Sequence, residues 1–150
     1  MQTWENGAKN ELPYGPWSSE PDKMHWIDEV TGLDCLAVRN AVMGHWCGYV
    51  GVGPEHRLYR HNYQEVDVMV HGGLTFSDVC QDSDDPAKGV CHRAALGRPE
   101  HVWWFGFDCA HFGDLLPGLD HGGQYRSIDY VRHECGSLAT QLGGALKARR

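Results

Sequence analysis

The most restrictive feature of this sequence is an almost uninterrupted run of large apolar side chains between His101 and Asp108. The run consists of Val102, Trp103, Trp104, Phe105 and Phe107. Successive residues of a strand point to opposite faces, so a run without polar positions leaves neither face for water. We therefore expect residues 101–108 to form a central strand, in a sheet that is covered on both faces.

Other segments have the period of strands. Cys35 to Arg39 and His45 to Val52 lie on either side of a turn and together predict a β-hairpin. Glu65 to His71 also alternates, with valines at positions 66, 68 and 70, which predicts another strand. Residues 77–100 are rich in turn formers and are expected to be a loop.

A single long helix is predicted near the C-terminal end of the chain. Ser127 is a suitable N-cap, and Asp129 lies in the first turn. Gly143 follows as a stop signal. One face is apolar and consists of Ile128, Val131, Cys135, Leu138 and Leu142. The predicted fold class is therefore α+β, a mainly antiparallel sheet of four to six strands with one long C-terminal helix and long ordered loops.

The first thirty residues differ from the rest in their content of Pro and Trp. Prolines oppose a continuous helix, so we expect an irregular arm over residues 1–30. Its Trp4, Trp17 and Trp26 are expected to pack on the remainder of the protein, because disordered tails contain few aromatic residues. The 150 residues fit a single domain spanning 1–150.

The charge balance excludes one broad class of function. The chain has 13 basic and 20 acidic residues, a net charge of -7. Nucleic-acid affinity comes mainly from Lys and Arg that neutralise phosphates, so we expect no nucleic-acid partner. No apolar run is long enough to span a membrane and the N-terminus lacks a signal-peptide pattern, so we expect a soluble, cytoplasmic protein with no membrane partner. The oligomeric state is left open.

The six cysteines contain no CxxC pair. A reducing compartment and a chain of this length make a disulfide framework unexpected, and most cysteines are interpreted as small core residues. Two alternatives stay open. Cys80, Cys91 and His92 are candidates for a structural zinc site with Cys109 or Cys135, and Cys109 beside His111 is a candidate nucleophile.

Two polar segments follow predicted strands and carry the candidate chemistry. His71 ends one strand and is followed by two glycines, which allow a close approach of backbone to a ligand. Asp108, His111 and Asp114 follow the most apolar strand, where polar groups are costly unless they are paired or bind a cation. The alternatives are a structural histidine at 71 and turn-capping carboxylates at 108 and 114.

These residues allow two kinds of centre. As a metal site they would bind Zn, Mn or Fe through His71, Asp108, His111 and Asp114. As a catalytic site they would use His71, Asp108 and His111 with Glu134, which lies beside the apolar face of the helix. Glu134 has the alternative of a surface carboxylate or a partner of an arginine. His45 to Tyr49 would either line the pocket or belong to the core.

Three strings of this chain resemble a family of small hypothetical proteins of bacteria and phages. They are Gly44-His45-Trp46-Cys47-Gly48-Tyr49-Val50, Val70-His71-Gly72-Gly73-Leu74-Thr75-Phe76 and Trp103-Trp104-Phe105-Gly106-Phe107-Asp108-Cys109-Ala110-His111. The resemblance runs from about Trp17 to Leu142 and implies one compact domain. It implies no particular activity.

The sequence thus supports a small hydrolase, with or without a divalent metal, in which water attacks a small-molecule phosphoester or carboxylic ester. The rival interpretation is a non-catalytic module that binds a small molecule or a protein through an aromatic pocket. A third is a structural protein in which the His and Asp side chains pair in place. A concave pocket with perturbed pKa values would favour the enzyme, and a flat exposed aromatic patch would favour an interaction protein.

Overall fold

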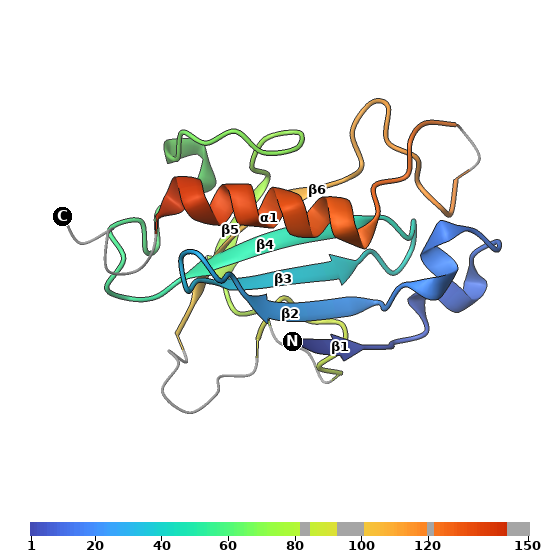
Figure 1. Ribbon diagram of the computed structural model, residues 1–150, viewed down its shortest axis with the longest axis horizontal. Coiled ribbons are helices and arrows are strands. Elements are labelled where there is room, and N and C mark those ends of the chain that lie inside the picture. Colours follow the sequence, from blue (N-terminus) through green and yellow to red (C-terminus); the bar gives the residue numbers. More distant parts are fainter. Residues whose placement is uncertain (82–84, 93–100, 120–121, 144–150) are drawn as a thin grey trace.

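The computed structural model describes residues 1–81, 85–92, 101–119 and 122–143, and in them a six-stranded antiparallel sheet carries one α-helix (Figure 1). The strand order is β1-β2-β3-β4-β6-β5. The strands are β1 (Gln2–Trp4), β2 (Lys23–Ile27), β3 (Asp34–Arg39), β4 (Trp46–Val52), β5 (Phe76–Val79) and β6 (Trp103–Asp108). The helices are α1 (Ile128–Leu142) and the short 3-10 helices η1 (Ala8–Glu11), η2 (Pro16–Ser19) and η3 (Tyr63–Glu65). The predicted α+β class is confirmed.

The predicted central strand and hairpin are both present. β3 and β4 pair antiparallel, with Val38 opposite Cys47, and β6 lies between β4 and β5. Phe105 and Phe107 of β6 pack in the core beneath α1, whereas Trp104 belongs to a second core on the other face. The unbroken apolar run is therefore explained by burial on both sides of the sheet.

The helix begins and ends where local signals predict. The Ser127 hydroxyl accepts a hydrogen bond from the backbone N–H of Tyr130, and Gly143 takes a φ of 82° after the last turn. Gly tolerates this left-handed φ without the penalty of a side chain. The buried face of α1 covers the sheet and consists of Val131, Cys135, Leu138, Ala139 and Leu142. None of the described helices is long and apolar enough to cross a membrane.

The predicted strand over Glu65 to His71 is wrong. Only η3 is present at its start, and no strand is assigned over residues 66–71. Val66, Val68 and Val70 still pack against the core beneath α1, which explains their alternation. The backbone of this extended segment forms hydrogen bonds with side chains of the helix and not with a neighbouring strand. The alternating pattern therefore predicted the extended conformation correctly, but not the pairing in a sheet.

Two parts of the sheet lie in segments that the sequence predicted to be irregular. Residues 2–4 and 23–27 of the expected arm form β1 and β2, and β5 falls largely within the expected loop 77–100, of which 82–84 and 93–100 lie outside the described residues. Trp17 and Trp26 are buried as predicted. The Arg39 guanidinium holds the arm, since it donates to the carboxylate of Asp22 at 3.1 Å.

Candidate functional site

A group of polar side chains gathers where β6 ends, beside the first half of α1. We call it the β6-end cluster, and it consists of His71, Asp108, His111, Asp114, Arg126, Tyr130 and Glu134. Residues from three separate parts of the chain meet here, 71, 108–114 and 126–134. The structure therefore brings together the histidine and carboxylate side chains of the predicted centre, but not the cysteine candidates.

His71 is held on both ring nitrogens. Its Nε2–H donates to Asp114 Oδ2 at 2.8 Å, because an ionised carboxylate only accepts, and its Nδ1 lies 2.7 Å from the Tyr130 hydroxyl. The backbone N–H of His71 donates to Glu134 Oε1 at 2.8 Å. The ring is thus fixed in position and tautomer by a carboxylate on one side and a phenol on the other.

Asp114 is the buried anion of the cluster, with a side chain that is 1% exposed. Burial alone would raise the pKa of this carboxyl. Hydrogen bonds from His71, from Arg126 Nε at 2.8 Å and from the backbone N–H of His111 at 3.0 Å outweigh burial and hold the pKa below its ordinary value. Asp114 therefore stays ionised at neutral pH.

His111 and Asp108 form a second and more exposed imidazole–carboxylate pair. His111 Nε2 lies 3.3 Å from Asp108 Oδ1, but the two atoms are not aligned for a hydrogen bond. The other carboxylate oxygen of Asp108 accepts from the Thr75 hydroxyl at 2.9 Å. About a third of the His111 side chain (34%) is exposed, compared with 12% for His71, although its Nε2 atom is buried. A substrate can therefore reach only the part of the His111 ring that lies away from Nε2.

Gly72 makes room for His111. A Cβ placed on Gly72 would lie 2.2 Å from ring atoms of His111, and the φ of +69° already favours glycine. The rings of His71 and His111 are consequently close, with centroids 6.0 Å apart. Gly72 thus allows another group to pack closely against the backbone, as the sequence predicted. That group is His111 of the same chain and not a ligand.

Two members of the cluster were missed by the sequence analysis. Tyr130 bonds His71, and Arg126 bonds Asp114 while its guanidinium carbon lies 5.0 Å from the centre of the Tyr130 ring. Tyr130 and Glu134 are four residues apart and so share a helix face. That spacing could have shown from the sequence that Tyr130 lies on the same helix face as Glu134. It could not have shown which residues pack against that face.

The predicted metal set does not fit the cluster as built. Both nitrogens of His71 and both carboxylate oxygens of Asp114 are already engaged by protein groups. Among the described residues, the only three candidate ligands whose donor atoms lie within 4.8 Å of one another are Cys80, Cys91 and His92. The metal at the β6-end cluster stays a prediction, and we derive no chemistry through it.

The expectation that the cysteines form no disulfide needs correction. Cys80 and Cys91 are joined, while Cys35, Cys47, Cys109 and Cys135 are free. The isolated antiparallel bridge between Gln81 and Val90 brings the two half-cystines together, which their spacing alone did not reveal. Cys109 and Cys135 are buried in the core and take no part in a shared site with Cys80.

The segment His45 to Tyr49 belongs mainly to the core. Trp46 is fully buried, and burial lowers the pKa of His45, whose Nδ1 has no hydrogen-bond partner. Cys47 and Tyr49 line a hollow of about 240 Å³ together with Val38 and Val90. The aromatic string thus builds the sheet rather than the β6-end cluster.

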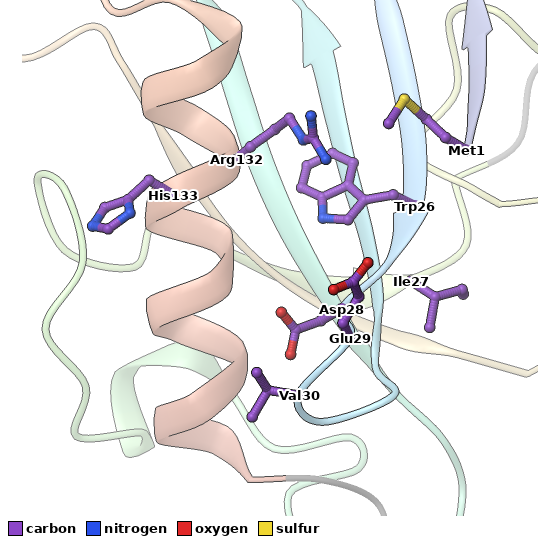
Figure 2. A pocket seen from close by; sticks show the side chains of 8 residues that line it. All are labelled: Met1, Trp26, Ile27, Asp28, Glu29, Val30, Arg132 and His133. Atoms are coloured by element: carbon purple, nitrogen blue, oxygen red, sulfur yellow. The ribbon is translucent and has the colours of Figure 1, made fainter.

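A separate hollow of about 540 Å³ lies between α1 and the turn that joins β2 to β3. Figure 2 shows the side chains that line it. Arg132 reaches from the helix over the ring of Trp26, whereas His133 points away from it. The Asp28 carboxylate accepts hydrogen bonds within its own turn, from the backbone N–H and the hydroxyl of Thr31. Within the described residues this hollow offers no imidazole–carboxylate pair, so the β6-end cluster is the stronger candidate.

Fold and site together define an α+β protein with two imidazole–carboxylate pairs at one strand end. No family model, curated protein or solved structure matches the chain. Its function is therefore argued from the geometry of the β6-end cluster.

Proposed function

We propose that this protein is a small hydrolase that cleaves a small-molecule phosphoester or carboxylic ester at the β6-end cluster. The observation that carries the proposal is the meeting of two imidazole–carboxylate pairs, His71–Asp114 and His111–Asp108, with ring centroids 6.0 Å apart. Perturbed titratable groups gathered at one place favour a catalytic site. We also propose the cytoplasm as its compartment, where the four free cysteines would stay reduced and the Cys80–Cys91 disulfide would be open to reduction.

In this mechanism His111 is the general base. Its Nδ1, the ring nitrogen that does not lie beside Asp108, takes a proton from a water molecule, and the oxygen of that water attacks the ester carbon or phosphorus. The bond to the leaving oxygen then breaks, and the imidazolium gives its proton to that oxygen. Asp108 is a positioning residue that stabilises the imidazolium as it forms. The 3.3 Å separation and imperfect alignment suit this role, since catalytic hydrogen bonds are often loose before substrate binds.

The second pair builds the wall of the site. Asp114, buried and ionised, fixes His71 and Arg126, and Glu134 fixes the backbone of His71. The Arg126 side chain is 21% exposed, so part of its guanidinium is available to an anionic substrate group. Positive charge next to a general base is the arrangement that hydrolysis of a phosphoester requires.

The test is turnover of para-nitrophenyl phosphate and para-nitrophenyl acetate by wild type and by His111→Ala. We expect the variant to lose about 10²–10⁴-fold in kcat/KM, the usual contribution of a general base. The wild-type kcat/KM should fall at acid pH, because a general base must be unprotonated to act. His133→Ala is the matched control, because His133 lies on the exposed side of α1, and it should retain full activity.

Equal turnover by folded wild type and His111→Ala would show that the proposed base is wrong. Elemental analysis of tag-free protein tests the metal-assisted version. About one equivalent of Zn, Mn or Fe that is lost in His111→Ala but kept in His92→Ala would place an ion at the β6-end cluster.

A binding module is the second candidate, and one recess favours it. A hollow of about 520 Å³ is lined by Tyr14, Trp17, Leu115, Leu116 and Pro117, among others. Tyr14 is 94% exposed there, and a tyrosine with a free face is a common contact for a small molecule or a peptide. If no ester is turned over, Tyr14→Ala in a ligand screen tests this function.

A further inference from the structure

We propose that Cys80, Cys91 and His92 form a Zn²⁺ site when the Cys80–Cys91 disulfide is reduced. This site is separate from the β6-end cluster and does not rest on the proposed hydrolase. The donor atoms of the three side chains lie within 4.8 Å of one another. His92 is 5% exposed and the two cysteines are half-buried, so the site is partly withdrawn from water.

The distance between Cys80 and His92 already suits a tetrahedral zinc ion, and the two sulfurs have to move apart once their bond is broken. Zn–S bonds of about 2.3 Å and Zn–N bonds of about 2.0–2.1 Å place S and N ligands about 3.6 Å apart at a tetrahedral angle. Cys80 Sγ and His92 Nδ1 are 3.7 Å apart. The indole N–H of Trp104 lies 3.5 Å from Cys80 Sγ, and such an outer hydrogen bond orients and stabilises a thiolate ligand.

The surrounding backbone holds the three ligands together without the disulfide. The buried ammonium of Lys23 donates to the carbonyls of Pro86, Gly89 and Cys91 at 2.7–2.9 Å. Gln81 and Val90 pair as an antiparallel bridge just inside the two cysteines. Reduction therefore leaves the backbone around the two cysteines anchored.

The chemistry balances with an external dithiol. The dithiol supplies two electrons and two protons and is itself oxidised to a disulfide, while the Sγ–Sγ bond breaks into two thiols. Zinc then replaces the two thiol protons and takes one nitrogen of His92. With three protein ligands, the fourth position of the tetrahedron is left to a water molecule.

The other cysteines do not compete for the ion. Burial raises the pKa of Cys47 to about 12 and raises the pKa of Cys35, Cys109 and Cys135 further. These thiols stay protonated at neutral pH, and a protonated thiol is a poor ligand. In the part of the chain that the structure describes, reduction therefore adds potential metal ligands only at Cys80 and Cys91.

The test compares the full-length protein in its oxidised form with the same protein reduced by a dithiol, which is then removed. Co²⁺ and then Zn²⁺ are titrated into each form. Reduced protein should bind about one equivalent of Co²⁺ and show the thiolate-to-cobalt charge-transfer absorption, and Zn²⁺ should displace it. Oxidised protein should show neither. His92→Ala should weaken binding by about tenfold or more, whereas Cys47→Ala should leave it unchanged.

Two results would overturn the proposal. One is reduced wild type that keeps its near-UV circular dichroism but binds no Co²⁺, which would leave Cys80–Cys91 as a disulfide only. The other is undiminished charge transfer in a reduced Cys80→Ser, Cys91→Ser variant. The comparison of oxidised with reduced wild type needs no substitution, so a variant that fails to fold does not weaken the test.

Discussion

His71 and His111 lie close together in space but differ in their hydrogen bonds and in their exposure. The His71 ring is bonded on both nitrogens and is 12% exposed, whereas His111 touches one carboxylate and is about one third exposed. An imidazole bonded on both nitrogens is held in place, while a loosely bonded one has a nitrogen left to meet a substrate. The environment of each ring, rather than its identity, therefore assigns His111 to chemistry and His71 to support.

Gly72 offers a test of this arrangement at the residue scale. Gly72→Ala would drive a methyl group into His111, and we expect it to displace that ring, to lower hydrolysis, and to destabilise the fold by more than the roughly 1–2 kcal/mol of a left-handed alanine. Urea unfolding and turnover measure the two effects.

Gly73→Ala is the matched control for that substitution. Gly73 has a similar φ of +79°, but nothing lies within 4 Å of the position of its Cβ. It should show the backbone penalty alone and retain activity. Equal losses in the two variants would mean that the contact with His111 has no consequence.

At the scale of elements, the segment 66–71 is fastened to α1 in place of a neighbouring strand. Gln141 accepts from the Met69 N–H and donates to the Met69 carbonyl, both at 2.7 Å, and Glu134 accepts from the His71 N–H. Side chains of the helix thus perform the pairing that a strand would perform. This fastening delivers His71 to the cluster.

Gln141→Ala should loosen the segment with little effect on the helix. The Met69 amide should exchange with deuterium faster, and the free energy of unfolding should fall by about 1 kcal/mol, since the lost bonds are exposed. Thr140→Ala is the control, because Thr140 is exposed on the same helix. Unchanged exchange at Met69 would show that the segment is held by its valines alone.

At the scale of the whole molecule, the sheet has different covers on its two faces. α1 and the segment 66–74 bury one face. Cys80 and Val90 pack on the other, where Leu36, Val38, Tyr49 and Trp104 form a second core. Buried histidines lie among these covers. His56 accepts from the Leu58 N–H and contacts the Leu142 carbonyl through Nε2, which requires a neutral ring.

These buried histidines make stability depend on pH. Burial lowers the pKa of His45 and of His56 below the value of about 6.5 in the unfolded chain. Their contribution is therefore complete above pH about 6.5 and is lost as pH falls, because the unfolded chain takes up the protons first.

We expect the free energy of unfolding to decrease between about pH 7 and pH 5, as measured in urea at each pH. His45→Gln should flatten this decrease, and His133→Gln, at an exposed position, should not. A slope that is unchanged in His45→Gln would mean that His45 titrates alike in both states.

Local patterns in the sequence were sufficient for the central strand β6, the hairpin β3–β4 and the helix α1 with its Ser127 cap. These features depend on the period of neighbouring residues and on cap chemistry, which lie within a few positions of each other. The gathering of costly polar groups after β6 likewise marked Asp108, His111 and Asp114 as residues that need partners.

Only the tertiary structure decided which partners those residues have. The pairing of His71 with Asp114, the contact of Tyr130 with His71 and the Cys80–Cys91 disulfide each join positions far apart in the chain. The same holds for 66–71, whose valines alternate as in a strand but whose backbone bonds to a helix. Such contacts form when the folding of the sheet and its loops brings distant segments together. A short stretch of sequence does not determine which distant segments will meet.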